Sequence, residues 1–548
     1  MAFFELTGEK YYGKVQSSYE REVLSMKRNY AKNAREVCWD WNPVQESQDI
    51  SLKMHKPVRK GIVMTLDQPW EGNCSGYLSV MKHGDTFRLY YRGSRNGEFT
   101  ERGKNGDESY KATACVGLPG LGRGTICMLE SKDGKHFTRP ALHNYDVEGY
   151  DSNNIVYTYV GNYLDNFSIF YDTNPNCPAD AKFKALSARN KVKNTQENLA
   201  FYENHDRSAM VPGLMYFKSP DGIHFEEVKH LPVDGAFDSY NLAFWDEKTQ
   251  QYFLYERDDH VPAEDEPRPA VPVDRENFVR DIKVAVSKDF ETWTTPALID
   301  CGEEADIYQY YTNHVQRYYR ADNMFLGIPT RYLDRNTPEQ FNNFKYLKLP
   351  GHEDARLKVI QYSGREGSAI TDAILMTSRD GFRFNRTDEA FKTPGIQNGS
   401  NWIYGDCFFA YGMAETESDI PGEPNEISLY IGDGYRTRNV DILRYTMRLD
   451  GFFSWHADYK GGSVLTKPFT FEGDNLHINF ETSGRGYVRI QICDENGEPI
   501  EGYNSGMLFG NDVDRNVDFE KPLSALNGKT VSMKIDMGDA ELYSYVFC

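Results

Sequence analysis

Long apolar runs and an excess of basic residues are both missing from this sequence. No window approaches the ~20 consecutive apolar residues that cross a bilayer, although 39% of the 548 residues are hydrophobic. The 62 Lys and Arg residues face 82 Asp and Glu residues, which gives a formal net charge of −20. These absences exclude a membrane protein and disfavour a surface for nucleic acid or anionic lipid, because a polyanion would be repelled.

Cysteine is sparse and follows no pattern. The nine cysteines never form a Cys-x-x-Cys pair, so neither a zinc ribbon nor a disulfide framework is predicted. This usage is typical of a reducing cytoplasm, and the first residues lack the basic segment and apolar stretch of a signal peptide. The glycine-rich run at 117–124 lacks the Lys-Ser/Thr of a phosphate loop. We therefore expect a cytoplasmic protein with no metal and no organic cofactor.

Aromatic residues, in contrast, are abundant. Seven Trp, 37 Tyr and 32 Phe make up 14% of the chain. Aromatic rings stack on the C–H faces of sugars, and tyrosine adds a hydroxyl, but sheet-rich proteins also use many aromatic residues. Composition alone leaves carbohydrate binding and a sheet-rich core as equal alternatives.

Internal repetition is the strongest signal in the chain. The motif Ser-x-Asp-Gly-x-x-aromatic begins at Ser131, Ser219 and Ser378; a copy without the Gly begins at Ser287, and one without the Ser begins at Arg448. Each copy follows a short β-prone run. Asp-Gly between two such runs predicts a hairpin, because Gly accepts a positive φ. Five such units of roughly 70–100 residues predict a five-bladed β-propeller.

The two ends of the chain show other patterns. From about residue 461, alternating segments separated by Gly, Asn and Asp turns predict a β-sandwich. Between Tyr19 and Arg35, apolar residues recur every three or four positions, which predicts an amphipathic helix. The predicted fold class is all-β, with a partly helical N-terminal extension at 1–45, a five-bladed β-propeller at 46–456 and a C-terminal β-sandwich at 457–548.

Eight segments of the chain carry a resemblance to a known group of proteins. They are Pro69-Trp-Glu-Gly72, Asn153-Asn-Ile-Val156, Phe170-Tyr-Asp-Thr-Asn-Pro175, Phe237-Asp-Ser-Tyr-Asn241, Pro329-Thr-Arg331, Ser378-Arg-Asp-Gly-Phe382, Leu449-Asp-Gly-Phe452 and Asp539-Ala-Glu-Leu-Tyr-Ser-Tyr-Val-Phe547. With the order of propeller and sandwich, they resemble bacterial proteins similar to glycoside hydrolase family 32, whose propeller is shared with families 43, 62, 68 and 130. The resemblance covers about residues 55–548 and implies a glycosidase without fixing its substrate.

The resemblance also implies a catalytic site at one end of the propeller channel. Glycosidic cleavage needs one protonated carboxyl for the leaving oxygen and one ionised carboxyl that attacks or activates water. By position in the first three blades, Glu71 corresponds to the nucleophile or base, Asp172 to the aspartate that orients sugar hydroxyls, and Asp238 to the acid/base residue. The local contexts depart from the family pattern, and the acid/base residue is normally Glu. The alternatives are Asp151 in the second blade and Glu303, Glu304 and Asp306 at the start of the fourth.

Further residues are expected around the channel. Arg92, Arg257 and Arg331 end β-prone runs, where bidentate donors hold sugar hydroxyls or an anion. Trp402 begins the fifth blade and offers a stacking surface. For each of these residues, a surface ion pair or packing between blades is the alternative. The predicted substrate-binding set is Trp70, Arg92, Asp151, Asn154, Arg257, His314, Arg331 and Trp402.

One main function and two alternatives follow. The main hypothesis is an intracellular glycoside hydrolase acting on short oligosaccharides or glycosides, an exo-acting furanosidase of the fructan or arabinan kind. The alternatives are a phosphorylase of the family 130 type, in which Arg and His residues hold phosphate, and a non-catalytic carbohydrate-binding propeller. The expected partner is a small carbohydrate rather than nucleic acid or membrane, and a homo-oligomer stays open.

Overall fold

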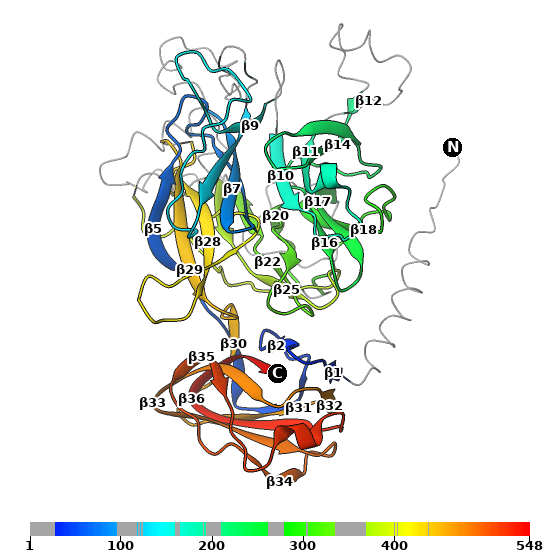
Figure 1. Cartoon of the computed structure of the whole chain (residues 1–548), viewed down its shortest axis with the longest axis vertical. Coiled ribbons are helices and arrows are strands. Elements are labelled where there is room, and N and C mark those ends of the chain that lie inside the picture. The colour runs from blue at the N-terminus through cyan, green and yellow to red at the C-terminus, as the bar shows by residue number, and fades with distance from the viewer. Residues whose placement is uncertain are drawn as a thin grey trace. The chain divides into compact units, whose positions relative to one another are not determined.

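A computed structural model divides the chain into two compact units, His55–Leu449 and a second unit that joins Met1–Met54 to Asp450–Cys548. Strands make up nearly all regular structure in the described residues, which contain no α-helix and only two short 3-10 turns, η1 (Ala179–Ala181) and η3 (Leu523–Leu526) (Figure 1). No helix in this part of the chain is long and apolar enough to cross a membrane. The described residues are 28–95, 118, 121, 124–158, 165–189, 191–192, 210–260, 279–302, 305–334, 369–398, 401–402, 404–436 and 438–548.

The His55–Leu449 unit is a β-propeller of five antiparallel blades in its described part. In each of the first three blades, four strands pair in their order along the chain. The first blade has β6 (Gly76–His83), β7 (Thr86–Gly93), β8 (Thr125–Ser131) and β9 (Ile155–Thr158). The second has β10 (Asp165–Tyr171), β11 (Phe183–Ala188), β14 (Leu214–Ser219) and β15 (Glu226–His230). The third has β16 (Leu242–Asp246), β17 (Gln251–His260), β18 (Val279–Ser287) and β19 (Ala297–Leu298).

The last two blades complete the ring. In the fourth blade, three strands are interrupted, so that one half pairs as β20-β23-β24 and the other as β21-β22-β25-β26. These strands are β20 (Gln309–Thr312), β21 (Gln316–Arg317), β22 (Phe325–Gly327), β23 (Thr330–Asp334), β24 (Ala369–Ala373), β25 (Met376–Ser378) and β26 (Asn385–Arg386). The fifth blade comprises β27 (Ala414–Thr416), β28 (Glu426–Asp433), β29 (Asp441–Arg448) and β5 (Val58–Thr65). Because β5 precedes the first blade and pairs with β29, backbone hydrogen bonds close the ring.

The first strands of the blades lie around a common axis. Strand β10 lies beside both β6 and β16, and Ser79 of β6 forms a parallel bridge with Tyr411 of the fifth blade. The packing between blades is largely aromatic. Between the third and fourth blades, for example, Phe253 and Phe325 lie 5.1 Å apart between ring centroids. Much of the aromatic content therefore serves the sheet-rich core.

Four copies of the repeated motif form one kind of turn. In the first copy, Ser131 Oγ accepts the Gly134 N–H at 2.9 Å, and Asp133 Oδ1 accepts the backbone N–H groups of Lys135 and His136. The copies at 219, 287 and 378 repeat these contacts. Each turn joins the third strand of a blade to its fourth, so the predicted hairpins are confirmed for these four copies.

Two copies depart from the pattern in an informative way. In the copy without Gly, Phe290 takes the left-handed conformation itself, with φ of 64°, and its ring is buried between the second and third blades. In the fifth copy, Asp450 belongs to the other unit, where it accepts hydrogen bonds from Ser544 at 2.7 Å and Arg35 at 3.3 Å. The fifth copy thus contributes no turn of this kind to the propeller.

Tyrosine hydroxyls hold three of these turns against the preceding blade. Tyr90 donates to the Gly222 carbonyl at 3.0 Å, and Tyr255 donates to the Gly381 carbonyl at 2.7 Å. Tyr430 of the fifth blade donates in the same way to Gly134 of the first, at 2.6 Å. The repeated turn is therefore a contact between blades as well as a hairpin.

Alanine at Gly222 is expected to destabilise the propeller strongly. A Cβ there would lie 2.5 Å from the Tyr90 hydroxyl and 2.9 Å from the Phe183 ring, at a φ of +76°. The left-handed backbone costs about 1–2 kcal/mol, and overpacking adds about 1–3 kcal/mol. Urea unfolding measures the sum. Gly84 is the matched control, because its φ is +61° with nothing within 4 Å of the added Cβ; equal losses at both sites would contradict the contact.

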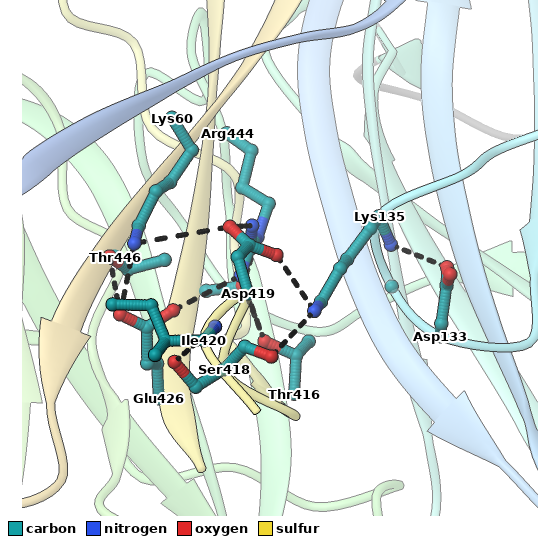
Figure 2. A network of polar contacts seen from close by, with 12 residues as sticks. Lys60, Asp133, Lys135, Thr416, Ser418, Asp419, Ile420, Glu426, Arg444 and Thr446 are labelled. Atoms are coloured by element: carbon teal, nitrogen blue, oxygen red, sulfur yellow. Dashed lines mark hydrogen bonds and ion pairs between the residues drawn. The ribbon is translucent and has the colours of Figure 1, made fainter. Parts of the chain in front are cut away.

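A charged network joins the fifth blade to the first at the ring closure (Figure 2). Asp419 accepts from Arg444 of β29 at 2.9 Å and lies 2.8 Å from Lys135, while Lys60 of β5 lies 3.9 Å away. Lys135 belongs to the turn of the first blade, where its backbone N–H bonds Asp133. The hydrogen bond with Lys135, followed by that with Arg444, lowers the pKa of Asp419 to about 2.

The second unit is a β-sandwich built from both sides of the propeller sequence. Strand β33 (Leu476–Cys493) pairs with β36 (Ser532–Phe547), and a register shift between Thr482 and Tyr487 interrupts the pairing. Such irregularities bend strands, and the sheet encloses one core of buried apolar side chains. The remaining strands are β1 (Arg28–Tyr30), β2 (Arg35–Val37), β3 (Val44–Gln48), β4 (Ile50–Met54), β30 (Phe453–Ala457), β31 (Gly462–Thr466), β32 (Phe469–Phe471), β34 (Pro499–Asn504) and β35 (Asn511–Asn516). A separate pair, β12 (Lys191–Val192) and β13 (Met210–Val211), belongs to the propeller unit.

The structure corrects two expectations about the N-terminal part. The predicted helix over 19–35 is wrong in its described part: β1 pairs with β32, and the Tyr30 ring lies 5.1 Å from that of Phe469. The rest of that segment lies outside the described residues. The boundaries also differ, because β4 pairs with β30 within the sandwich unit. Residues 46–54 and 450–456, which the sequence analysis placed in the propeller, thus belong to the sandwich.

Candidate functional site

An aromatic cluster occupies the propeller axis where the first strands begin. Tyr77 of the first blade lies 5.5 Å from Tyr240 of the third and 6.2 Å from Phe408 of the fifth, between ring centroids. Tyr311 of the fourth blade lies 5.5 Å from Phe408 and 5.2 Å from Tyr404. All five side chains are buried. We call these five residues the axial aromatic cluster. Because the first and third blades are not neighbours, the contact between Tyr77 and Tyr240 spans the propeller axis.

Four arginines lie against aromatic rings at the same end. The Arg92 guanidinium lies 4.8 Å from the Tyr77 ring centroid, and those of Arg257 and Arg280 lie 5.3 and 5.9 Å from that of Tyr311. Arg92 donates to the Cys74 carbonyl, the Tyr435 hydroxyl and the Asn166 amide oxygen, and Arg280 donates to Gln309. The axial arginine set is Arg92, Arg257, Arg280 and Arg436.

A constrained turn at the start of β16 presents Asp238 to solvent. Phe237 is buried with φ of 54°, a conformation that costs energy in a bulky residue. The Asn241 side-chain amide donates to the Phe237 carbonyl at 2.9 Å. Asn241 Oδ1 accepts a hydrogen bond from the backbone N–H of Arg257 at 2.9 Å. Ser239 Oγ donates to the Tyr311 carbonyl. These contacts fix the position of Asp238 beside the axial aromatic cluster.

Glu256 lies beneath this turn in an unusual state. Its side chain is fully buried, and neither carboxyl oxygen has a hydrogen-bond partner in the part of the chain that the structure describes. A Cβ on Gly235 would lie 2.9 Å from Glu256 Oε1, which places the carboxyl directly against the turn. Burial, and then the nearby charge of Asp258, raises the pKa of Glu256 well above its ordinary value. Burial thus favours the protonated form of Glu256, a residue that no sequence motif marks.

Glu71 is accounted for by a buried network in the first blade. Arg139 binds it through Nε at 3.1 Å and Nη2 at 2.7 Å, the Tyr91 hydroxyl donates to Oε1, and the Gln68 N–H donates to Oε2 at 3.0 Å. The side chain is fully buried. Both carboxyl oxygens of Glu71 are therefore bonded within the first blade.

Trp70 and Asn154 extend this network. The Trp70 indole donates to Asn154 Oδ1 at 2.8 Å, and the Asn154 amide donates to the Tyr91 hydroxyl at 2.8 Å. Both residues are buried. Asp151 is exposed beyond this group. Of these predicted binding residues, the structure therefore gives Trp70 and Asn154 a role in the core.

Asp172 forms a buried ion pair where β10 ends. Lys184 Nζ donates to Oδ2, the Tyr252 hydroxyl donates to Oδ2 at 2.7 Å, and the Asn174 N–H donates to Oδ1 at 2.9 Å. Both charged side chains are almost fully buried. Asp238 lies where its blade begins, so the structure separates Asp172 from Asp238 by the length of the first strands.

Of the other candidates, His314 lies closest to the axial aromatic cluster. Its ring lies 5.6 Å from that of Tyr240, and burial lowers its pKa to about 4, so it is neutral at pH 7. Arg331 forms a bidentate pair with Asp372, at 2.9 and 2.6 Å. The half-buried Trp402 indole donates to the Gly395 carbonyl at 2.6 Å.

The fourth-blade alternatives lie elsewhere. Asp306 lines a cavity of about 590 Å³ that also includes His260, Asp281 and Arg386. Glu303 and Glu304 lie outside the described residues. Within the described ranges, no three His, Cys, Asp or Glu side chains group as a metal site.

No family model and no curated protein matches this sequence. Among solved structures, the chain is similar to one titled "Glycoside hydrolase" with 13% identity and a TM-score of 0.37, over 71% of this chain and 92% of that chain. A GH32 β-fructofuranosidase of Bombyx mori is similar with 7% identity and a TM-score of 0.34, over 90% of this chain and 94% of that chain. An N-acetylgalactosamine deacetylase of F. plautii is similar with 12% identity and a TM-score of 0.36, over 76% of this chain and 96% of that chain. These values are too low to assign an activity.

Proposed function

We propose that the chain is a glycoside hydrolase whose site lies at the axial aromatic cluster, with Asp238 and Glu256 as its two carboxyl groups. Glycosidic cleavage needs one protonated and one ionised carboxyl, and environments that push two pKa values apart assign those roles. Glu256 is the proton donor to the leaving oxygen. Asp238, exposed to solvent, is the ionised group that attacks the anomeric carbon or activates water.

The state of Glu256 carries this proposal. A carboxyl that serves only the fold normally has hydrogen-bond partners when it is buried, as Glu71 and Asp172 do. Glu256 has none, and it lies against the turn that presents Asp238. Acid-assisted hydrolysis requires one carboxyl whose surroundings favour the protonated form and a second carboxyl within reach of the same substrate.

The axial aromatic cluster supports an exo-acting enzyme on short substrates. Its rings meet across the axis, so a polysaccharide cannot pass through the ring at this level. Aromatic rings are also the side chains on which sugars stack. We therefore retain the exo-acting furanosidase of the fructan or arabinan kind as the specific form of the proposal.

A panel of nitrophenyl furanosides and pyranosides, with and without phosphate, tests this function on the full chain. We expect phosphate-independent turnover of at least one furanoside, and Asp238→Asn is expected to lower kcat about 10²–10⁴-fold. Asp322→Asn is the control, because that aspartate is also exposed and pairs with Lys248. Absence of turnover, with sugar binding unchanged in Asp238→Asn, would indicate a carbohydrate-binding protein instead.

A further inference from the structure

The Arg257 guanidinium is buried but not fully bonded. Its side chain is 5% exposed, yet among the described residues neither Nε nor Nη1 has a hydrogen-bond partner, and the Asp259 carboxylate lies 3.8 Å from Nε as an ion pair. Arg317, in contrast, binds Asp246 through two bonds of 2.7 Å. A buried N–H group without an acceptor costs about 1–3 kcal/mol, and more when the group is charged. The fold itself does not benefit from leaving these N–H groups of Arg257 without acceptors.

A second arginine lies against the same aromatic ring as Arg257. Arg280 lies against the same Tyr311 ring and donates to Gln309, a neutral acceptor. Glu256, the adjacent residue, is fully buried, and burial disfavours the charged form of its carboxyl. Guanidinium groups keep their charge at any physiological pH. Two guanidinium groups therefore lie against one ring at the end that holds Asp238, in a chain whose net charge is −20.

We infer that this end of the propeller binds an anionic group, a carboxylate or a phosphate, with Arg257 as its principal donor. This inference rests on the proposed function in one respect only: the bound anion is taken to lie beside a glycoside. A planar guanidinium matches two oxygens of a carboxylate or phosphate, and the unpartnered Nε and Nη1 supply two N–H donors. The axial aromatic cluster would then carry the apolar face of the sugar.

The same anion can come from two sources. It is either a substituent of the sugar, as in a uronate or a sugar phosphate, or free inorganic phosphate as a second substrate. In the second case the phosphate oxygen attacks the anomeric carbon, the glycosidic bond breaks, and Glu256 gives its proton to the leaving oxygen, so that a sugar 1-phosphate and an alcohol are formed. The two sources are separated by the ligand that binds.

Titration calorimetry on the full chain tests this inference with glucuronate, galacturonate, arabinose 5-phosphate and inorganic phosphate, against glucose and arabinose as neutral controls. We expect at least one anion to bind roughly 10–100-fold more tightly than its neutral counterpart and to weaken as salt is added. Binding of sugar anions alone assigns the charge to the substrate. Binding of inorganic phosphate assigns it to a second substrate. Equal binding of anions and neutral sugars would overturn the inference.

The Arg257→Met variant separates binding from folding. If Arg257 holds an anion, the variant loses the 10–100-fold preference and is at least as stable as the native chain, since two buried N–H groups that lack acceptors among the described residues have been removed. Arg438→Met is the control; that half-exposed arginine pairs with Asp433 at 2.6 Å and should leave anion binding unchanged. A destabilised Arg257→Met variant with native anion affinity would contradict the inference. Turnover of neutral glycosides without any anion binding would defeat this inference alone and leave the hydrolase proposal standing.

Discussion

The Glu256→Gln variant is expected to lose about 10²–10⁴-fold in kcat on any glycoside that the native chain cleaves. Glutamine keeps the shape of the side chain but cannot donate a carboxyl proton to the leaving oxygen. The loss should be smallest for aryl glycosides with acidic leaving groups, which need least protonation. Steady-state kinetics with two leaving groups of different pKa measure both effects.

The pH dependence of the same variant gives a second measurement. Because burial raises the pKa of Glu256, the native enzyme should lose activity as the pH rises through that value, and the variant should lack this alkaline limb. The folded state also binds this proton more tightly than the unfolded chain, in which the pKa is ~4.3. Stability of the native chain thus falls as the pH rises above the unfolded value. The Glu256→Gln variant has no carboxyl proton to lose at this position, so its stability relative to that of the native chain should increase toward alkaline pH.

Two further glutamates serve as controls. Glu130, which pairs with Arg88 at 3.1 Å in the first blade, should tolerate glutamine without a change in kcat. Glu71→Gln separates the structural assignment from the catalytic one: we expect a lower free energy of unfolding, with kcat of the folded protein preserved. A Glu71→Gln variant that is stable but inactive would restore Glu71 as the nucleophile and contradict the assignment to Glu256 and Asp238.

Breaking the ion pair of Asp172 and Lys184 should cause the largest loss of stability. Both side chains are almost fully buried, so removing one charge leaves the other uncompensated, at a cost of about 3–5 kcal/mol. Lys184→Met is the sharper test, because its carbon chain lies over the Phe290 ring, with Nζ 5.5 Å from the ring centroid. Urea unfolding of the variant measures the loss.

A control variant and a double variant show whether the loss of stability in Lys184→Met comes from the unpaired charge or from altered packing. Lys218, in the same blade, pairs with the exposed Asp180 at 2.7 Å, and Lys218→Met should leave the free energy of unfolding nearly unchanged. Adding Asp172→Asn to Lys184→Met should recover part of the loss, since no unpaired charge is left. A double variant no more stable than Lys184→Met would mean that packing, not charge, holds the site.

The repeated motif explains why the blades could be predicted from the sequence. Ser-x-Asp-Gly forms its contacts within six residues, so its turn survives in any tertiary context, and even Phe290 adopts the required backbone. The N-terminal segment was predicted wrongly for the opposite reason. Its apolar spacing fits a helix, but the described part pairs with β32, and long-range pairing overrides local preference.

The site was harder to predict, because its roles depend on partners that are distant in the sequence. Glu71 and Asp172 were predicted as active-site residues, but Arg139 and Lys184 satisfy them, and no pattern in the sequence identifies those pairs. Glu256 follows the apolar segment Tyr252–Tyr255 in β17, and nothing in that segment marks it as functional. Its distinguishing property is the lack of a partner, which only coordinates can reveal.

The pairing of β2, β3 and β4 with strands near the C-terminus has a consequence for biosynthesis. These three strands precede the five blades in the chain, and their partners β36, β31 and β30 follow the blades, so the nascent chain carries open strand edges until those partners have been made. Unpaired edges invite aggregation. A chain cut short by premature termination would expose them permanently, even where all five blades had been made.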